Sequence, residues 1–367
     1  MIVGVLGGGQ LGRMMALAGY PLGLRFRFFD PDPEAPAGQL AELHIGAFDD
    51  PQALRRFAAD VAVVTYEFEN IPAFPVRELA KTLPVWPPPD ALETAQDRLA
   101  EKGLFRALDI PTAPFVAVGS RADLETAGRH LPFPLVLKTR RLGYDGKGQW
   151  VLRTAADSER VAAMVDKTPM IVERFVCFER ELSCIAVRGM DGATAFYPLI
   201  ENHHQGGILR QSLAPAPECP DGLQRQAEEY VGRILDALDY VGVLTVEFFL
   251  DNGQLIANEM APRVHNSGHW TIEGAETSQF ENHLRAILGW PLGSTAARGY
   301  AAMINLIGAL PDLPTLLAVP GVHAHHYGKA ARPGRKLGHV TLCSSQWQAL
   351  REKVENIATR IVFPSVR

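Results

Sequence analysis

VLTVEFFLDNGQLIANEMAPRVHNSGHW, residues 243–270, says more about fold and chemistry than any other segment of the chain. Runs of Val, Leu, Ile and Phe on both sides of Asp251-Asn252-Gly253 predict a β-hairpin. Each run carries one glutamate, Glu247 and then Glu259, and a carboxylate on such a strand is costly unless it is paired or binds a cation. Two converging carboxylates with Asn258 beside them would suit Mg²⁺, which takes hard oxygen ligands and shares them with substrate phosphates.

The register of this hairpin makes a sharper prediction. A regular two-residue Asn-Gly turn would pair Glu247 with Asn258 and point Glu259 to the opposite face, because side chains alternate along a strand. The two carboxylates converge only if the loop has an odd residue count or the strand has a bulge. We therefore predict such an irregularity. The alternative is a plain surface hairpin with solvated acids.

The composition is that of an ordinary globular enzyme, with 47% hydrophobic and 21% charged residues in a chain of 367. The net charge of −5 gives no sign of the basic face that nucleic-acid binding usually needs. The sequence has no apolar run of membrane-spanning length and no signal-peptide pattern, so we expect a cytoplasmic protein without membrane partners. The cysteines are scattered and are expected to be free thiols. They are Cys177, Cys184, Cys219 and Cys343.

Strand and helix patterns alternate in the first part of the chain, which predicts a parallel α/β sheet there. The expected strands are 2–6, 25–29 and 61–65. Pro87-Pro88-Pro89 then interrupts regular structure and marks a boundary. A small β-rich unit is expected at the end of the chain. The other expected elements are helices over 91–108, over 224–238 and after the capping box at 278–281, and strands near 136–138, 149–152, 171–174 and 182–187.

The first glycine-rich loop fits G-x-G-x-x-G at Gly7, Gly9 and Gly12, after a strand and before a helix. Asp30 lies near the distance at which an acid would bind a ribose, so a dinucleotide site is one interpretation. Backbone N–H groups at a helix N-terminus bind any phosphate, so a nucleotide monophosphate would suit the loop as well. A tight turn without a ligand is the third interpretation.

A second glycine-rich segment, 138–149, joins two expected strands and carries several cations. Mobile glycine loops with a nearby lysine cover ATP phosphates in several folds, although this one is not a Walker A motif. Lys138 closes the apolar run 134–137, which favours a phosphate ligand over a solvated lysine. The strand end at Glu173 could meet an adenine edge, but a plain strand end is the simpler interpretation.

Two further groups of residues leave alternatives open. His203 and His204 lack zinc-like spacing to other ligands, so transition-metal binding is not favoured. Arg332, Arg335 and Lys336 could clamp a phosphate or form an exposed basic turn.

Taken together and in order, these motifs resemble the ATP-grasp superfamily. More closely, the chain resembles the family of N5-carboxyaminoimidazole ribonucleotide synthases, the ATPase subunit of phosphoribosylaminoimidazole carboxylase in purine synthesis. The matching segments are 7–14, 143–149, 258–269 and 332–339. The fold class implied is α/β (α+β). It has a Rossmann-like N-terminal domain (1–88), a central ATP-grasp domain (89–292, with a lid at about 110–175) and a small β-rich C-terminal domain (293–367).

The resemblance also implies roles for individual residues. ATP would be bound by Arg98, Lys138, Gly143, Tyr144, Asp145, Gly146, Lys147, Gly148, Gln149, Glu173, Arg174, Phe175, Val176, Glu181, His204, Asn258 and Glu259. Mg²⁺, with Mn²⁺ as an alternative, would be held by Glu247 and Glu259. The aminoimidazole ribonucleotide would be surrounded by Gln10, Glu67, Tyr144, Asp145, Lys329, Arg332 and Arg335. The catalytic residues would be Arg263, His265, Asp145 and Lys138, with the first two facing the bicarbonate-derived group.

The implied activity is ATP-dependent carboxylation of 5-aminoimidazole ribonucleotide with bicarbonate, via carboxyphosphate, in de novo purine (IMP) biosynthesis. The implied protein is a homodimeric ligase, and its first glycine loop binds the ribonucleotide phosphate rather than NAD. Lys147 departs from the arginine of many relatives, which keeps the charge but loses the bidentate fork. The competing hypotheses are an NAD-dependent oxidoreductase, an ATP-grasp ligase with another acceptor, and a non-catalytic nucleotide-binding regulator. The presence of both Glu247 and Glu259 argues against the regulator.

Overall fold

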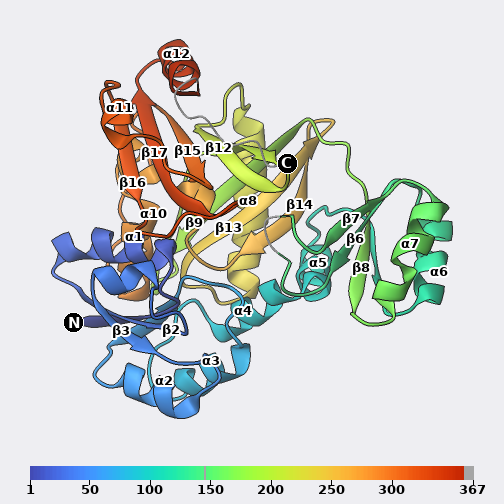
Figure 1. Cartoon of the computed structure of the whole chain (residues 1–367), viewed down its shortest axis with the longest axis horizontal. Coiled ribbons are helices and arrows are strands. Elements are labelled where there is room, and N and C mark those ends of the chain that lie inside the picture. The colour runs from blue at the N-terminus through green and yellow to red at the C-terminus, as the bar shows by residue number, and fades with distance from the viewer. Residues whose placement is uncertain (144–145, 359–367) are drawn as a thin grey trace.

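The computed structural model describes residues 1–143 and 146–358, and within these residues the strands form three sheets. Figure 1 shows the N-terminal sheet at one end, the lid with α6 and α7 standing to one side, and a long twisted sheet through the middle. The strand orders are β3-β2-β1-β4, then β14-β13-β9-β11-β12-β15-β17-β16 with β10 on β9, and β5-β8-β6-β7. Among the described helices none is both long and apolar enough to cross a membrane.

The N-terminal sheet is parallel, as the sequence predicts, and its central strand β1 is almost completely buried. Its strands are β1 (Ile2–Leu6), β2 (Arg25–Asp30), β3 (Glu42–Ile45) and β4 (Val63–Tyr66). Its helical segments are α1 (Gln10–Gly19), η1 (Tyr20–Leu22), η2 (Pro36–Gln39), α2 (Pro51–Ala58) and α3 (Ala73–Ala80). Strand β3 was not predicted, because it is short and half-exposed and has no apolar alternation. Parallel pairing brings the carboxyl ends of β1 and β4 to one edge, so the glycine loop meets the segment from Glu67.

The large sheet is antiparallel, and helices bury both of its faces. Its strands are β9 (Arg180–Arg188), β10 (Thr194–Phe196), β11 (Ile200–Gln205), β12 (Ile208–Ala214), β13 (Gly242–Asp251), β14 (Gln254–Ala261), β15 (Tyr300–Ile307), β16 (Val322–His326) and β17 (Lys336–Ser344). Helix α8 (Asp221–Ala237) covers one face, and α10 (Gln279–Ile287) with α1 covers the other. The C-terminal strands do not form a sheet of their own, because β15 pairs with β12 and continues the large sheet.

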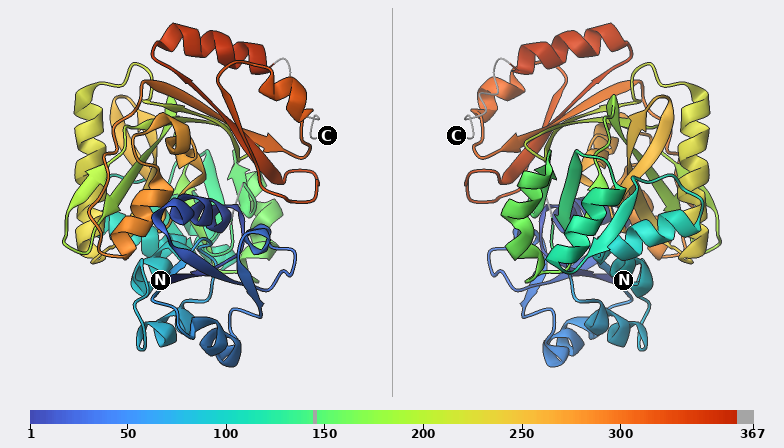
Figure 2. Two further views of the ribbon diagram at one scale, coloured as in Figure 1. Left: turned by 90° about the vertical axis from the view of Figure 1, so that its left-hand side faces the viewer. Right: turned by 90° about the vertical axis from the view of Figure 1, so that its right-hand side faces the viewer.

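The C-terminal helices and the short helical turns complete this part of the structure. They are η3 (Asn266–Gly268), α9 (Thr271–Gly274), α11 (Leu313–Leu317) and α12 (Trp347–Ala358). Figure 2 shows α12 lying along the outer side of the C-terminal strands, where it packs on β15 and β17.

The lid is an antiparallel sheet with two helices on its outer face. Its elements are β5 (Phe115–Val118), α6 (Arg121–His130), β6 (Leu135–Thr139), β7 (Gln149–Leu152), α7 (Ala155–Val165) and β8 (Met170–Arg174). Leu135 and Leu137 point from β6 into a small core beneath these helices.

The helix predicted over 91–108 is wrong as a single element. The structure has α4 (Pro89–Gln96) and α5 (Arg98–Ala107), separated by Asp97 with φ −123° and ψ 107°. The Asp97 carboxylate caps α5 by accepting from the amide of Leu99 at 3.0 Å. It also pairs with Arg140 at 2.6 Å, a lid contact that no local pattern could reveal.

Buried neutral histidines make the folded protein sensitive to acid. His283 of α10 accepts a hydrogen bond from the Val243 amide at 3.1 Å and contacts the Thr65 hydroxyl at 2.8 Å. Burial lowers the pKa of His283 to about 3, against about 6.5 in an unfolded chain. Above pH 6.5 both states are neutral. Between pH 6.5 and about 3 only the unfolded state takes up this proton, so stability falls by at most about 1.4 kcal/mol per pH unit.

We therefore expect urea unfolding to show declining stability from pH 7 to pH 5. His283→Asn keeps an acceptor for the Val243 amide, lowers stability at pH 7 and makes this decline shallower. His323→Asn, at an exposed position, is the matched control. Equal pH slopes for wild type and His283→Asn would contradict the assignment.

Candidate functional site

The glutamate hairpin has the predicted irregularity. Glu247 of β13 lies directly opposite Glu259 of β14, and the register shifts between Glu247 and Phe248 so that Phe248 faces Ala257. Asn258 is the extra residue of this bulge. Directly opposed residues on antiparallel strands point to the same face, so the two carboxylates converge.

The two carboxylates have different electrostatic surroundings. Burial and the nearby charge of Glu259 raise the pKa of Glu247 to about 7. Burial alone would also raise the pKa of Glu259, but Arg98 outweighs it and lowers that pKa to about 2. Arg98 Nη1 lies 2.9 Å from Glu259 Oε2, and His265 Nε2 lies 3.4 Å from Glu247 Oε1. Glu247 is therefore the carboxylate that lacks a strong cationic partner.

This donor set fits Mg²⁺. Asn258 Oδ1 is buried and has no hydrogen-bond partner among the described residues, so this oxygen is available to a cation at the bulge. The described residues contain no group of three or more His, Cys, Asp or Glu side chains that could hold a metal by themselves. Two carboxylates that complete their shell with substrate phosphates and water are the usual arrangement for Mg²⁺.

A buried cluster of charges lies beside the hairpin and involves the lid. Lys138 of β6 contacts Glu173 of β8 at 3.0 Å, and Lys102 of α5 contacts the same carboxylate oxygen at 3.6 Å. Burial would raise the pKa of Glu173, but the two lysines hold it below its usual value. Glu101 of α5 accepts from the Met260 amide at 2.6 Å, next to Glu259. The two lysines of the cluster are thus buried and share one carboxylate, next to the strand that carries Glu259.

At the strand end after Glu173, two backbone amides are already hydrogen-bonded within the protein. The amides of Arg174 and Phe175 donate to Pro114 O and Pro134 O at 2.8 and 3.1 Å, so these two groups serve the fold. The side chain of Phe175 is exposed, and the next residue, Val176, is buried.

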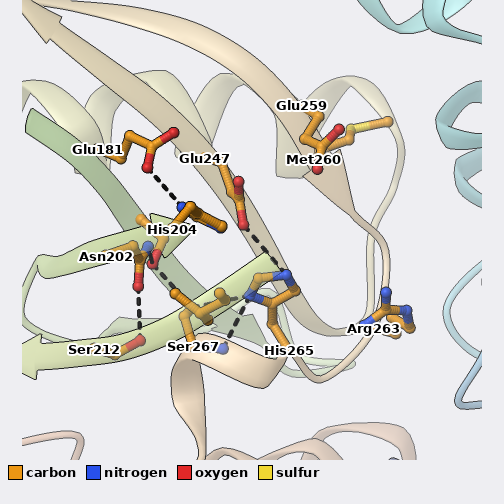
Figure 3. A network of polar contacts seen from close by, with 12 residues as sticks. Glu181, Asn202, His204, Ser212, Glu247, Glu259, Met260, Arg263, His265 and Ser267 are labelled. Atoms are coloured by element: carbon orange, nitrogen blue, oxygen red, sulfur yellow. Dashed lines mark hydrogen bonds and ion pairs between the residues drawn. The ribbon is translucent and has the colours of Figure 1, made fainter. Parts of the chain in front are cut away.

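A second acid–imidazole pair lies on neighbouring strands of the large sheet. Glu181 of β9 and His204 of β11 are 2.6 Å apart (Figure 3). Burial lowers the pKa of His204, but the Glu181 carboxylate and other nearby acids raise it above its ordinary value.

Arg263 and His265 follow the hairpin directly. Arg263 is ion-paired with Glu69 and donates to Val264 O at 2.9 Å. His265 directly precedes η3 as its N-cap, and its Nδ1 lies 2.9 Å from Ser267 Oγ. Burial and the Arg263 charge lower the pKa of His265 to about 3, so its imidazole is neutral.

A buried chain of hydrogen bonds supports His265 from behind. Figure 3 shows it running from the imidazole through Ser267 into the large sheet. Its further members are Ser183, Asn202 and Ser212, joined by contacts of 2.7–2.9 Å. These residues had no motif to mark them, and only the fold reveals their role.

Two residues predicted to bind the ribonucleotide, Gln10 and Lys329, come from opposite ends of the chain and meet. Lys329 donates to Gln10 Oε1, which joins the C-terminal loop to the N-terminus of α1. Arg332 is exposed in the same loop, and Arg335 donates to Ala330 O at 3.3 Å. Tyr144 and Asp145 lie outside the described residues.

The structure does not support phosphate binding by the first glycine loop. The Gly9 amide donates to Glu67 Oε1 at 2.7 Å, and the Gly12 amide donates to Glu67 Oε2 at 3.2 Å. The Gly8 amide donates to the Asp30 carboxylate at 2.7 Å. Two carboxylates thus occupy the donors that a phosphate would need, and Asp30 is not available as a ribose ligand of a dinucleotide. Gly-x-Gly loops bind any anion, and here the anions belong to the protein.

Comparison with known proteins decides between ATP-grasp families. Three family models match in succession: the ribonucleotide synthetase preATP-grasp domain over 1–96, the ATP-grasp domain over 103–280, and the phosphoribosylaminoimidazole carboxylase C-terminal domain over 301–353. The chain is 53% identical over 362 residues to N5-carboxyaminoimidazole ribonucleotide synthase of Pseudomonas aeruginosa, covering 98% of this chain and 99% of that one. The chain belongs to the N5-carboxyaminoimidazole ribonucleotide synthase family.

Solved structures agree with this assignment. The N5-carboxyaminoimidazole ribonucleotide synthetase of Thermus thermophilus matches with a TM-score of 0.95 and 55% identity, over 100% of both chains. The Aspergillus clavatus synthase in complex with ADP and 5-aminoimidazole ribonucleotide matches with a TM-score of 0.91 and 32% identity, over 98% of both chains. The predicted three-domain ATP-grasp architecture is thereby confirmed.

In this synthase-family chain the glycine loop of the lid packs on the turn between β11 and β12. A Cβ atom on Gly146 would lie 3.1 Å from Gly206 O and 3.1 Å from Gly207 Cα. Gly143 lies beside Thr139 and the Arg98 guanidinium, and a Cβ there would be 3.3 and 3.4 Å from them. Gly143 and Gly146 thus contact both the lid and the turn of the large sheet.

Gly146→Ala is expected to raise KM for ATP about five- to tenfold. It adds a side chain at φ 75° and presses it against the backbone of the turn. Gly192→Ala is the matched control, since Gly192 has φ 81° and none of the described atoms lies within 4 Å of its Cβ position. Steady-state kinetics with varied ATP measures both variants. Equal effects in the two variants would show that backbone strain, not the loop contact, is responsible.

Proposed function

We propose that this protein is an N5-carboxyaminoimidazole ribonucleotide synthase, an ATP-dependent ligase of purine (IMP) biosynthesis. It carboxylates 5-aminoimidazole ribonucleotide with bicarbonate and releases ADP and phosphate. The observation that carries the proposal is one continuous segment with two kinds of functional side chain. The opposed carboxylates of Glu247 and Glu259 are followed directly by Arg263 and His265. Full-length similarity to the Pseudomonas synthase supports the choice of acceptor.

The first chemical step is proposed to activate bicarbonate. A bicarbonate oxygen attacks the γ-phosphorus of ATP, the bond to the β-phosphate oxygen breaks, and carboxyphosphate and ADP form. Lys138 and Arg98, from the lid and α5, would bind the phosphates, and the loop 143–149 would exclude water from the anhydride. Mg²⁺ held by Glu247, Glu259 and Asn258 would neutralise charge on the transferring phosphoryl group.

The second step transfers the carboxyl group. The amine of the ribonucleotide forms a C–N bond to the carboxyl carbon, phosphate leaves, and one amine proton is lost. Arg263 would hold the developing carboxylate by charge-assisted hydrogen bonds, and neutral His265 would donate or accept without adding charge. We propose that this proton passes either to Asp145 or to the departing phosphate. Gln10, Glu67, Lys329, Arg332 and Arg335 would position the ribonucleotide.

Phosphate release from MgATP tests this function. Release is expected with bicarbonate and aminoimidazole ribonucleotide together, and it should vanish when EDTA removes the metal. Replacing bicarbonate by formate should abolish it, which separates this ligase from formate-using relatives. Release that does not depend on the ribonucleotide, or that persists with formate instead of bicarbonate, would refute the proposed acceptor or carboxyl donor.

Binding of the ribonucleotide is expected to weaken in alkali. Burial is the main cause that lowers the pKa of Lys329 to about 8, although nearby Glu67 opposes it. The ammonium is present below pH 8 and is lost above it, so KM for the ribonucleotide should rise between pH 7.5 and 9.5. Lys329→Arg should flatten this rise, since arginine stays charged. A pH-independent KM in the wild type would contradict a role for the Lys329 charge.

We further propose a cytoplasmic homodimer, as the family resemblance implies, and units bounded near residues 88 and 292. Sedimentation velocity of the full chain tests the oligomeric state. Limited proteolysis at these two boundaries tests the units.

A further inference from the structure

Three imidazoles stack where the end of η3 meets strands β16 and β17. His269 follows η3, His339 is on β17 and His325 is on β16. The rings of His269 and His339 are 4.4 Å apart with an interplanar angle of 4°, and His325 stacks on the other face of His339 at 4.4 Å and 13°. His269 and His339 are completely buried. The stack is therefore a rigid packed element.

Tyr327 connects this stack to the C-terminal loop that carries Lys329, Arg332 and Arg335. Its hydroxyl lies 2.7 Å from His339 Nδ1. Burial raises the pKa of Tyr327 well above its ordinary value and lowers that of His339 well below, so the phenol donates and the neutral imidazole accepts. The Lys329 ammonium lies 5.8 Å from the centre of the Tyr327 ring, within the range of a cation–π contact. Tyr327 thus supports Lys329 from one face while His339 fixes Tyr327.

The His269 end of the stack lies against the turn that carries His265. His265 accepts from the Ser267 amide at 3.3 Å, and the His269 amide donates to Asn266 O at 3.2 Å, which closes η3. His269 also packs on Phe280 of α10 at 5.5 Å. The side chain of His269 is therefore held between α10 and β17. Because the His269 amide also closes η3, this packing holds η3 in position.

We propose that Tyr327, His339 and His269 are positioning residues that set the distance between Lys329 and the turn of His265. In this way they would align the ribonucleotide amine with the bicarbonate-derived group. The inference rests on the proposed function and adds residues that touch neither substrate. Misplacement of a reacting group by about 1 Å can cost about 100-fold in rate, so a rigid spacer at this point has a direct catalytic use.

Tyr327→Phe tests the proposal with the smallest change. It removes the hydroxyl that bonds His339 and leaves the ring beneath Lys329. We expect KM for aminoimidazole ribonucleotide to rise about fivefold, the usual effect of one lost hydrogen bond, and KM for ATP to change less than about twofold. Tyr300→Phe removes the same atom from β15, where the ring packs on Trp347, and should leave both constants unchanged.

His339→Phe gives a second, independent route. It keeps a stacking ring and removes the acceptor, so it should raise the same KM. In the double variant Tyr327→Phe/His339→Phe the rise should stay near fivefold instead of multiplying, because both single changes break one bond. If Tyr327 and His339 had a purely structural role, the variants would have lower thermal stability, and KM for the ribonucleotide would not rise more than KM for ATP.

Two results would overturn the inference. One is a KM for the ribonucleotide in Tyr327→Phe equal to that of Tyr300→Phe. The other is a parallel rise in both KM values. Wild-type enzyme is measured alongside, and an absence of ribonucleotide-dependent phosphate release in the wild type would overturn the proposed function itself.

Discussion

Glu259→Gln is expected to lower kcat by about 100- to 1,000-fold, because in the proposed mechanism Glu259 would hold the cation that neutralises charge on the transferring phosphoryl group. The same change frees Arg98, whose 2.9 Å contact with Glu259 Oε2 is charge-assisted. ATP should still bind, since Lys138 and the lid are unchanged. Phosphate release and binding of nucleotide, measured separately, distinguish the two effects.

Glu179→Gln is the matched control for this change. Glu179 accepts from the Asn252 amide at 3.1 Å, at the turn end of the same hairpin. The control should keep near wild-type turnover. Full turnover in Glu259→Gln would refute the metal assignment and with it the mechanism proposed for the first step.

Arg263→Met is expected to lower carboxylated product by about 100- to 1,000-fold, since in the proposed second step Arg263 would be the main cationic partner of the developing carboxylate. The change also leaves Glu69 unpaired at a mostly buried position, at a cost of about 3 kcal/mol in stability. Glu69→Gln/Arg263→Met removes that penalty and should recover thermal stability without recovering turnover. Product is measured directly, and melting temperature is measured in parallel.

Recovery of turnover in the double variant would contradict a direct role for Arg263. It would show that the arginine matters only as the partner of Glu69. Arg263→Lys separates charge from geometry, because lysine keeps the charge and loses the planar fork. Relative to Arg263→Met, we expect Arg263→Lys to recover more of the thermal stability than of the activity.

The hairpin was predictable because its constraints are local. Apolar runs around Asp251-Asn252-Gly253 identify the strands, and the alternation of side chains then requires a bulge if Glu247 and Glu259 are to converge. The parallel N-terminal sheet follows from equally local patterns. In each case the prediction depends on a short sequence pattern: apolar runs around a turn for the hairpin, and strand patterns alternating with helix patterns for the parallel sheet.

The remaining features depend on contacts between distant segments. Asp97, where the predicted 91–108 helix is interrupted, is also bonded to Arg140 of the lid, and Glu67 fills the first glycine loop from 55–58 residues away. Lys102 belongs to the charge cluster but carries no motif; its only signal is its place one helical turn after Arg98. Tertiary packing determines which residue pairs with a buried charge. These partners are therefore not predictable from a single sequence.

The most direct test of the account uses bicarbonate labelled with ¹⁸O. If ATP activates bicarbonate in the site formed by the glutamate hairpin and Arg263, one bicarbonate oxygen must leave with the phosphate. Mass spectrometry of phosphate from the wild-type enzyme with MgATP and aminoimidazole ribonucleotide should show one transferred ¹⁸O atom per phosphate. Phosphate without label, formed together with carboxylated product, would contradict the carboxyphosphate route and the central role given to this site.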